Sequence, residues 1–168
     1  MKSTVALMVV ALAIVASTPS LTFAQNFSPS AQASDGAHQS VVASPLQANE
    51  KIAVGFYTAA LNDKNPEAAM KFISPNFRQH SALAEDGYAG LRKFLEWVRA
   101  EQPNLHADIT RVFADGDYVI LDVRMIRHPG DRGLAIAEIY RVQDGKLAEH
   151  WDRIQEIPEK SKNANGLF

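Results

Sequence analysis

Three polar residues in the last third of the chain, Glu138, His150 and Asp152, have side chains suited to proton transfer. Carboxyl and imidazole groups both exchange protons under mild conditions, which makes them the usual acids and bases of enzymes. His150 and Asp152 are two residues apart, so on a strand they share one face, and Glu149 takes the other. Together the three could remove a proton beside a carbonyl group, with Asp152 orienting His150 or the substrate. Such chemistry needs no electron carrier.

Whether Glu138 meets His150 depends on the turn at Asp144-Gly145. In a two-residue type I′ turn, Gln143 pairs with Lys146 and Glu138 points away from His150. In a type I turn followed by a G1 bulge, Val142 pairs with Lys146, which sets Glu138 opposite His150. We favour the bulge, because the other register directs a carboxylate away from its nearby partner.

The region from residue 105 onward has the two-residue period of strands. Asp115-Gly116 and Asp144-Gly145 separate runs rich in β-branched residues, which is typical of hairpins. The runs predict four strands in an antiparallel meander. The last of them runs from Lys146 to Glu156.

Helical signals come before these strands. Apolar residues recur at helical spacing over 47–62, which predicts a first helix. Asn65-Pro66-Glu67 starts a second, short helix that Ser74-Pro75 stops, and Asp86 can cap a third that ends by Pro103. Helices followed by strands indicate an α+β fold, and a curved sheet around a helix would enclose a pocket.

A resemblance to a known family extends over nearly all of 47–158. It is carried by Ala48–Lys51, Phe56-Tyr57, Arg78–His80, Gly90-Leu91, Arg111–Val119 and, with its DGK-x-x-EHWD ending, Arg141–Asp152. The chain resembles the SnoaL-like polyketide cyclase family of the NTF2-like superfamily. The resemblance implies a cone-shaped α+β fold: three N-terminal helices on a curved antiparallel sheet of about four strands that encloses a pocket. It also implies a homodimer through the sheet, no metal and no organic cofactor.

Three further residues are predicted to bind substrate. His80 closes a largely apolar segment, and in related sequences a Gln-His pair at this place borders the pocket. Asp122 interrupts an apolar strand, so it faces either the cavity or solvent. Trp151, an aromatic residue between His150 and Asp152, could contact a ligand. Packing in the core or at an interface is the open alternative for it.

Composition excludes several classes of function. Seventeen Lys and Arg against 19 Asp and Glu leave no positive surplus to attract nucleic acid. The absence of Cys excludes disulfides, thiolate zinc sites and a Cys nucleophile. His80, His150, Glu138 and Asp152 lack short metal-ligand spacing, so we expect no metal.

The amino terminus is predicted to direct export. Lys2 precedes an apolar run from Val5 to Ala16, and small residues end at Ala24. Twelve residues at about 1.5 Å each are too short for a bilayer core of about 30 Å. We therefore expect a signal peptide over 1–24, although Ala31-Gln32-Ala33 also fits a cleavage site. The mature protein is expected to be secreted or periplasmic, without a membrane partner.

The remaining segments divide simply. Residues 25–46, which include His38, are expected to form a flexible linker. Residues 47–158 are expected to form the folded domain, and residues 159–168 a polar tail. Three functions stay open for the domain: an acid/base enzyme acting on a small apolar carbonyl compound by aldol-type cyclisation, isomerisation or hydration, a non-catalytic binder of a small molecule, and a protein-interaction module. We favour the first.

Overall fold

A computed structural model describes residues 44–168 of the chain. The expected signal peptide and linker residues 25–43, with His38, lie outside the described residues. Within 44–168, the helices lack the length and apolar character that crossing a bilayer requires.

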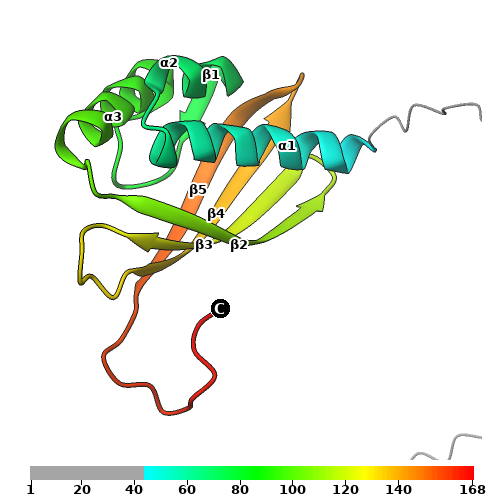
Figure 1. The fold of residues 1–168 in the computed structure, drawn as a ribbon. Helices are drawn as coiled ribbons and strands as arrows, with labels where there is room; N and C mark the ends of the chain where they lie inside the picture. The colour runs from blue at the N-terminus through cyan, green and yellow to red at the C-terminus, as the bar shows by residue number, and fades with distance from the viewer. Residues whose placement is uncertain (1–43) are drawn as a thin grey trace, which may run out of the picture. The chain divides into compact units, whose positions relative to one another are not determined.

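The described residues form an α+β fold (Figure 1). The three helices lie on one side of a twisted sheet, and α1 runs across the strands. The elements in chain order are α1 (Pro45–Tyr57), a π-helical turn (Thr58–Asn62), α2 (Pro66–Ala69), a 3₁₀ turn (Met70–Phe72), β1 (Ile73–Gln79), α3 (Gly87–Glu101), β2 (His106–Asp115), β3 (Tyr118–Ile126), β4 (Leu134–Gln143) and β5 (Lys146–Glu156).

Capping side chains set where the helices begin. The Ser44 side chain accepts from the Gln47 backbone N–H, and the Gln47 side chain accepts from the Ser44 N–H. This capping box starts α1 at Pro45, two residues before the predicted position. Asn65 and Asp86 cap α2 and α3, as predicted.

The sheet has five strands in the order β1-β5-β4-β3-β2, one more than the four of the predicted meander. The additional strand, β1, is parallel to β5, whereas the other pairs are antiparallel. The helical segment ends at Phe72, before Ser74-Pro75 as predicted, and Ser74-Pro75 itself lies inside β1. Proline is tolerated there because β1 is an edge strand, with a hydrogen-bonding partner on one side alone.

The last hairpin differs from both predicted registers. Asp144 and Gly145 have φ values of 51° and 69°, as a type I′ turn requires, and Gln143 pairs with Lys146. The favoured G1 bulge at the turn is therefore wrong. The register instead shifts at Ala148: Val142 pairs with Leu147, but Arg141 pairs with Glu149.

This bulge moves the rest of β5 by one residue. Tyr140 then lies opposite His150 and Glu138 opposite Asp152. Because one residue of register reverses which side chains face inward, His150 and Asp152 share the inner face with Glu138. The expected meeting of Glu138 and His150 thus occurs, by a different route from the one predicted.

The core fills the space between the helices and the inner face of the sheet. Leu95 and Val98 of α3 and Leu121 and Leu147 of the sheet are almost fully buried. Gly90 brings α3 close to the preceding loop: a Cβ at this position would lie 2.2 Å from the Glu85 carbonyl oxygen.

We expect Gly90→Ala to destabilise the domain by about 1–3 kcal/mol, because the Glu85 backbone must move to make room. An alanine that replaces glycine inside a helix ordinarily stabilises it by up to about 1 kcal/mol, so the expected sign is the opposite of the usual one. Urea unfolding measures the change. Ala89→Ser, at an exposed neighbouring position, is the control and should stay within about 0.5 kcal/mol. A stabilised Gly90→Ala protein would contradict the close approach.

Candidate functional site

A cavity of about 270 Å³ lies between the helices and the inner face of the sheet. Its walls are mainly apolar and include Phe56 of α1, Leu91 and Leu95 of α3, and Ile136 of β4. Leu83 and Trp97 also line it and remain 65% and 48% exposed, so they mark its opening. This is the kind of concave, apolar site that binds small molecules.

A buried carboxyl–imidazole pair lies in the cavity wall. His150 Nε2 is 2.6 Å from Glu138 Oε2, and the two residues are 9% and 6% exposed. The His150 ring also stacks on the ring of Tyr140, its partner across the strands, with 4.8 Å between centroids. The distance and the burial make this the strongest candidate for acid/base chemistry in the described chain.

Two tyrosines surround the carboxyl group. The Tyr57 hydroxyl, at the end of α1, donates to Glu138 Oε1 at 3.1 Å. Burial raises the pKa of Tyr57 well above 10, and the nearby Glu138 charge adds to the effect. Burial, followed by the same charge, also raises the pKa of Tyr140. Both phenols therefore stay protonated where a free tyrosine ionises.

A second polar group comes from β1 and the loop after it. Gln79 Oε1 lies 2.8 Å from His150 Nδ1 and accepts from the Ser81 backbone N–H at 3.0 Å. The Ser81 hydroxyl donates to Asp152 Oδ2 at 2.5 Å. Hydrogen bonds therefore connect Tyr57, Glu138, His150 and Gln79, and Ser81 joins Asp152 to the same side of the cavity.

The structure brings half of the six predicted site residues together. Glu138, His150 and Asp152 line the cavity. The other three, His80, Asp122 and Trp151, do not line the cavity, contrary to the prediction. His80 stacks flat on Trp151, 4.6 Å between centroids, and its Nε2 lies 3.3 Å from Glu149.

Strand alternation explains why these residues lie elsewhere. Trp151 lies between His150 and Asp152, so it points to the outer face of the sheet. His80 follows Gln79, the residue that faces inward, and therefore also lies on the outer side. Asp122 pairs with Arg111 at 2.7 Å, and its strand neighbours Leu121 and Val123 are the residues that point into the core.

Sequence reasoning missed three residues of the site: Tyr57, Gln79 and Ser81. Tyr57 falls in the apolar pattern that predicted the first helix, which explains its buried ring but not the hydrogen bond of its hydroxyl to Glu138. Gln79 belongs to the Gln-His pair that the resemblance placed at the border of the pocket; alternation along β1 would have selected it over His80, had residues 73–79 been predicted as a strand. No local signal marks Ser81, because the fold alone brings it to Asp152.

The charges around the cavity limit what it can bind. Arg127 is the one Lys or Arg among the described residues that line it, and its guanidinium is held by Asp131 and Glu156 at 2.8 Å each. The carboxyl groups of Glu138 and Asp152 face the cavity without a Lys or Arg partner. Nothing in residues 44–168 gathers three metal-ligating side chains at one point. The lining therefore suits a neutral molecule better than an anion.

The fold and the cavity define a class: an α+β domain with helices on one side of a twisted sheet and a pocket between them. The family model of the SnoaL-like domain matches residues 53–150. That match covers more than half of the chain, which therefore belongs to the SnoaL-like family. No curated protein sequence matches the chain significantly.

Solved structures of the same fold confirm the architecture. A proposed ketosteroid isomerase from Kribbella flavida is 20% identical, with a TM-score of 0.58, over 70% of this chain and 85% of its own. A proposed polyketide cyclase from Bacillus cereus is 23% identical, with a TM-score of 0.55, over 64% and 74%. AclR, a proposed hydroxylase from Streptomyces galilaeus, is 22% identical, with a TM-score of 0.56, over 67% and 82%. At these identities the likeness establishes the fold.

The two buried tyrosines predict an alkaline transition. Unfolded tyrosine ionises near pH 10, whereas the pKa values of Tyr57 and Tyr140 are raised in the folded domain. The stability that their neutral forms provide is complete below about pH 10 and is lost as the pH rises further. Absorbance at 295 nm should show two of the four phenols ionising only when the domain unfolds.

The matched variant is Tyr57→Phe, in which one phenol instead of two should ionise only when the domain unfolds. Ionisation of all four tyrosines near pH 10 in a domain that is still folded by circular dichroism would contradict the buried network.

Proposed function

We propose that this protein is an acid/base enzyme that acts on a small, neutral, mainly apolar carbonyl compound. The observation that carries the proposal is the 2.6 Å contact between Glu138 and His150 in the wall of an apolar cavity. Among the charged side chains of the described residues, neither member is tied to a Lys or Arg. A non-catalytic binder would need no such pair.

The pair can exchange a proton with a bound carbonyl compound. In its ionic form, the Glu138 carboxylate takes a proton from the carbon beside the carbonyl group. The C–H bond breaks, its electrons move to the carbonyl oxygen, and an enolate forms. The His150 imidazolium balances the enolate charge, so the site stays neutral overall. Return of the proton at another carbon completes an isomerisation, and attack on a second carbonyl carbon completes an aldol closure.

The surroundings favour this step. Apolar walls exclude water and strengthen the electrostatic interaction between the enolate and the imidazolium. Tyr57 keeps its proton and can therefore act as a hydrogen-bond donor throughout. The structural neighbours include proteins described as a proposed ketosteroid isomerase and a proposed polyketide cyclase. Both reactions move protons beside carbonyl groups, which supports the proposal at the level of chemistry.

The proposal places this chemistry outside the cytoplasm, because residues 1–24 have the pattern of a signal peptide. Cell fractionation of the full chain, with mass spectrometry of the amino terminus, tests export. Full-length protein retained in the cytoplasm would contradict it.

Proton abstraction is tested with 2-tetralone, a neutral bicyclic ketone with acidic α-protons. In D₂O, the protein should accelerate exchange of these protons above the buffer rate, as followed by NMR. Glu138→Gln keeps the shape of the side chain but removes the base, so exchange should fall by about 10²–10⁴-fold. Glu149→Gln, on the outer face, is the matched control and should exchange like the unaltered protein.

Binding is measured in the same samples by line broadening of the ketone signals. Glu138→Gln that still binds the ketone but no longer exchanges its protons supports the enzyme. Binding by the unaltered protein without faster exchange would replace the proposal with a non-catalytic binder. Native mass spectrometry of the purified protein then searches for a co-purifying small molecule.

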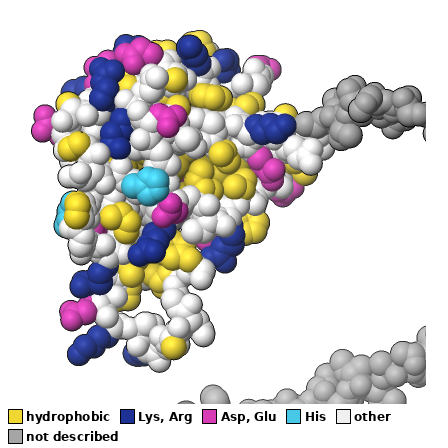
Figure 2. Space-filling view, viewed as in Figure 1, with side chains coloured by type: hydrophobic (Ala, Val, Ile, Leu, Met, Phe, Trp, Pro, Cys, Tyr) yellow, Lys and Arg dark blue, Asp and Glu magenta, His cyan; other side chains and the backbone are white. Residues whose placement is uncertain are grey.

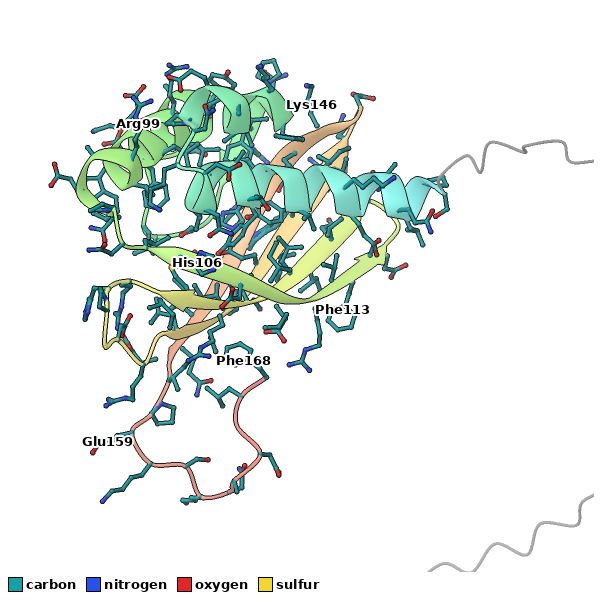
Figure 3. All side chains as sticks on the ribbon, in the orientation of Figure 1. Arg99, His106, Phe113, Lys146, Glu159 and Phe168 are labelled. Atoms are coloured by element: carbon teal, nitrogen blue, oxygen red, sulfur yellow. The ribbon has the colours of Figure 1, made fainter. Side chains whose placement is uncertain are left out.

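We also propose that the protein is a homodimer through the outer face of the sheet. A row of apolar residues crosses this face in register: Phe113, Ile120, Ile139 and Trp151. Phe113 and Ile120 are 55% and 38% exposed, and Phe113 extends from β2 on the side away from α1 (Figure 3). Ion pairs flank the row on both sides, Arg111–Asp122 and Arg141–Glu149. A second copy would bury the row and leave charges at the rim.

Light scattering tests the dimer. The unaltered protein should have twice the monomer mass, and Ile120→Arg should have the monomer mass because a charge enters the apolar row. Glu96→Arg introduces the same side chain on the exposed surface of α3 and should leave the dimer intact. A monomeric unaltered protein at high concentration would overturn this assignment without affecting the cavity.

A further inference from the structure

The side-chain amide of Gln79 has one orientation that satisfies its neighbours. The backbone N–H of Ser81 lies 3.0 Å from Gln79 Oε1, and a backbone N–H can only donate. If the amide were flipped, its NH₂ group would face another donor. The oxygen must therefore face Ser81, which fixes the orientation of the amide.

The same oxygen fixes the protonation of one imidazole nitrogen. Gln79 Oε1 lies 2.8 Å from His150 Nδ1, and an amide oxygen can only accept. His150 Nδ1 must therefore carry a hydrogen. The other nitrogen, Nε2, either has a free lone pair, in a neutral ring, or carries a second hydrogen, in an imidazolium.

The contact with Glu138 then has to contain a proton. A carboxylate oxygen and a bare Nε2 are both acceptors, and at 2.6 Å they would repel each other. The pair is stable as a carboxylic acid with a neutral ring or as a carboxylate with an imidazolium. Both forms hold one proton between Glu138 and His150, and both are neutral overall.

We propose that Gln79 is a positioning residue that keeps His150 in the Nδ1–H form, so that Glu138 and His150 always share one transferable proton. This inference rests on the proposed function, for which it names the residue that prepares the acid/base pair. Gln79 acts through His150 and does not itself exchange a proton.

Removal of Gln79 frees the ring. Without the acceptor at Nδ1, the pair releases one proton to solvent: Nδ1 becomes bare, and Nε2 keeps the single ring hydrogen and donates it to the Glu138 carboxylate. The pair then carries one negative charge, and the neutral ring no longer supplies the imidazolium that balances the enolate. The fold should tolerate the change, since β1 is an edge strand and Gln79 is half-buried.

Nitrogen-15 NMR of the imidazole side chains tests the tautomer directly, with the His150 signals assigned by their loss in His150→Asn. The unaltered protein should show a protonated Nδ1 on His150. Gln79→Leu should convert His150 to the Nε2–H form. Gln79→Glu keeps an acceptor for both Ser81 and His150 and should retain the protonated Nδ1. Asn76→Leu, an exposed position on the same strand, is the control and should change nothing.

The ketone exchange assay adds a kinetic readout. Gln79→Leu should exchange protons roughly 10²-fold more slowly than the unaltered protein, with binding of the ketone retained, and Gln79→Glu should recover part of the rate. A bare Nδ1 in the unaltered protein would overturn the inference, even if no Gln79 variant folds. So would a Gln79→Leu protein whose His150 tautomer is unchanged. If instead the unaltered protein has a protonated Nδ1 but does not accelerate exchange, the proposed function is refuted.

Discussion

The hydrogen bond between Glu138 and His150 is the interaction on which the rest of the site depends. A carboxyl group buried among apolar side chains is costly unless each of its oxygens has a partner. His150 provides one partner and Tyr57 the other. Gln79 Oε1 contacts the other ring nitrogen of His150, Nδ1. Among the described residues, no buried side-chain polar atom lacks a hydrogen-bond partner. The network is therefore satisfied without water and without an ion.

Each member of this network comes from a different part of the fold. Tyr57 ends α1 where the helix widens into a π-helical turn, a feature that often occurs at functional sites. Gln79 ends β1, and its backbone N–H donates to Asp86, the cap of α3. Movement of the loop between β1 and α3 would therefore change the His150 contact as well.

The two faces of the sheet carry different kinds of surface. The inner face combines apolar walls with a few polar groups, whereas the outer face carries an apolar row between ion pairs. The side of the domain that Figure 2 shows, in the orientation of Figure 1, has apolar patches among basic and acidic side chains. Since unrelated chemistries share this fold, the scaffold explains where a ligand binds, and the polar groups decide what happens to it.

The sequence by itself determined the fold class, the starts of α2 and α3, the four antiparallel strands and the types of group available for chemistry, because these follow from local periodicity and capping. It also placed Glu138, His150 and Asp152 as candidates. The edge strand β1 and the bulge at Ala148 were decided by the tertiary structure. A proline is acceptable in a strand only where its missing N–H faces no partner, and the residue that this bulge adds, Ala148, is buried in the packed domain. Both conditions depend on neighbours distant in sequence, which no local pattern records.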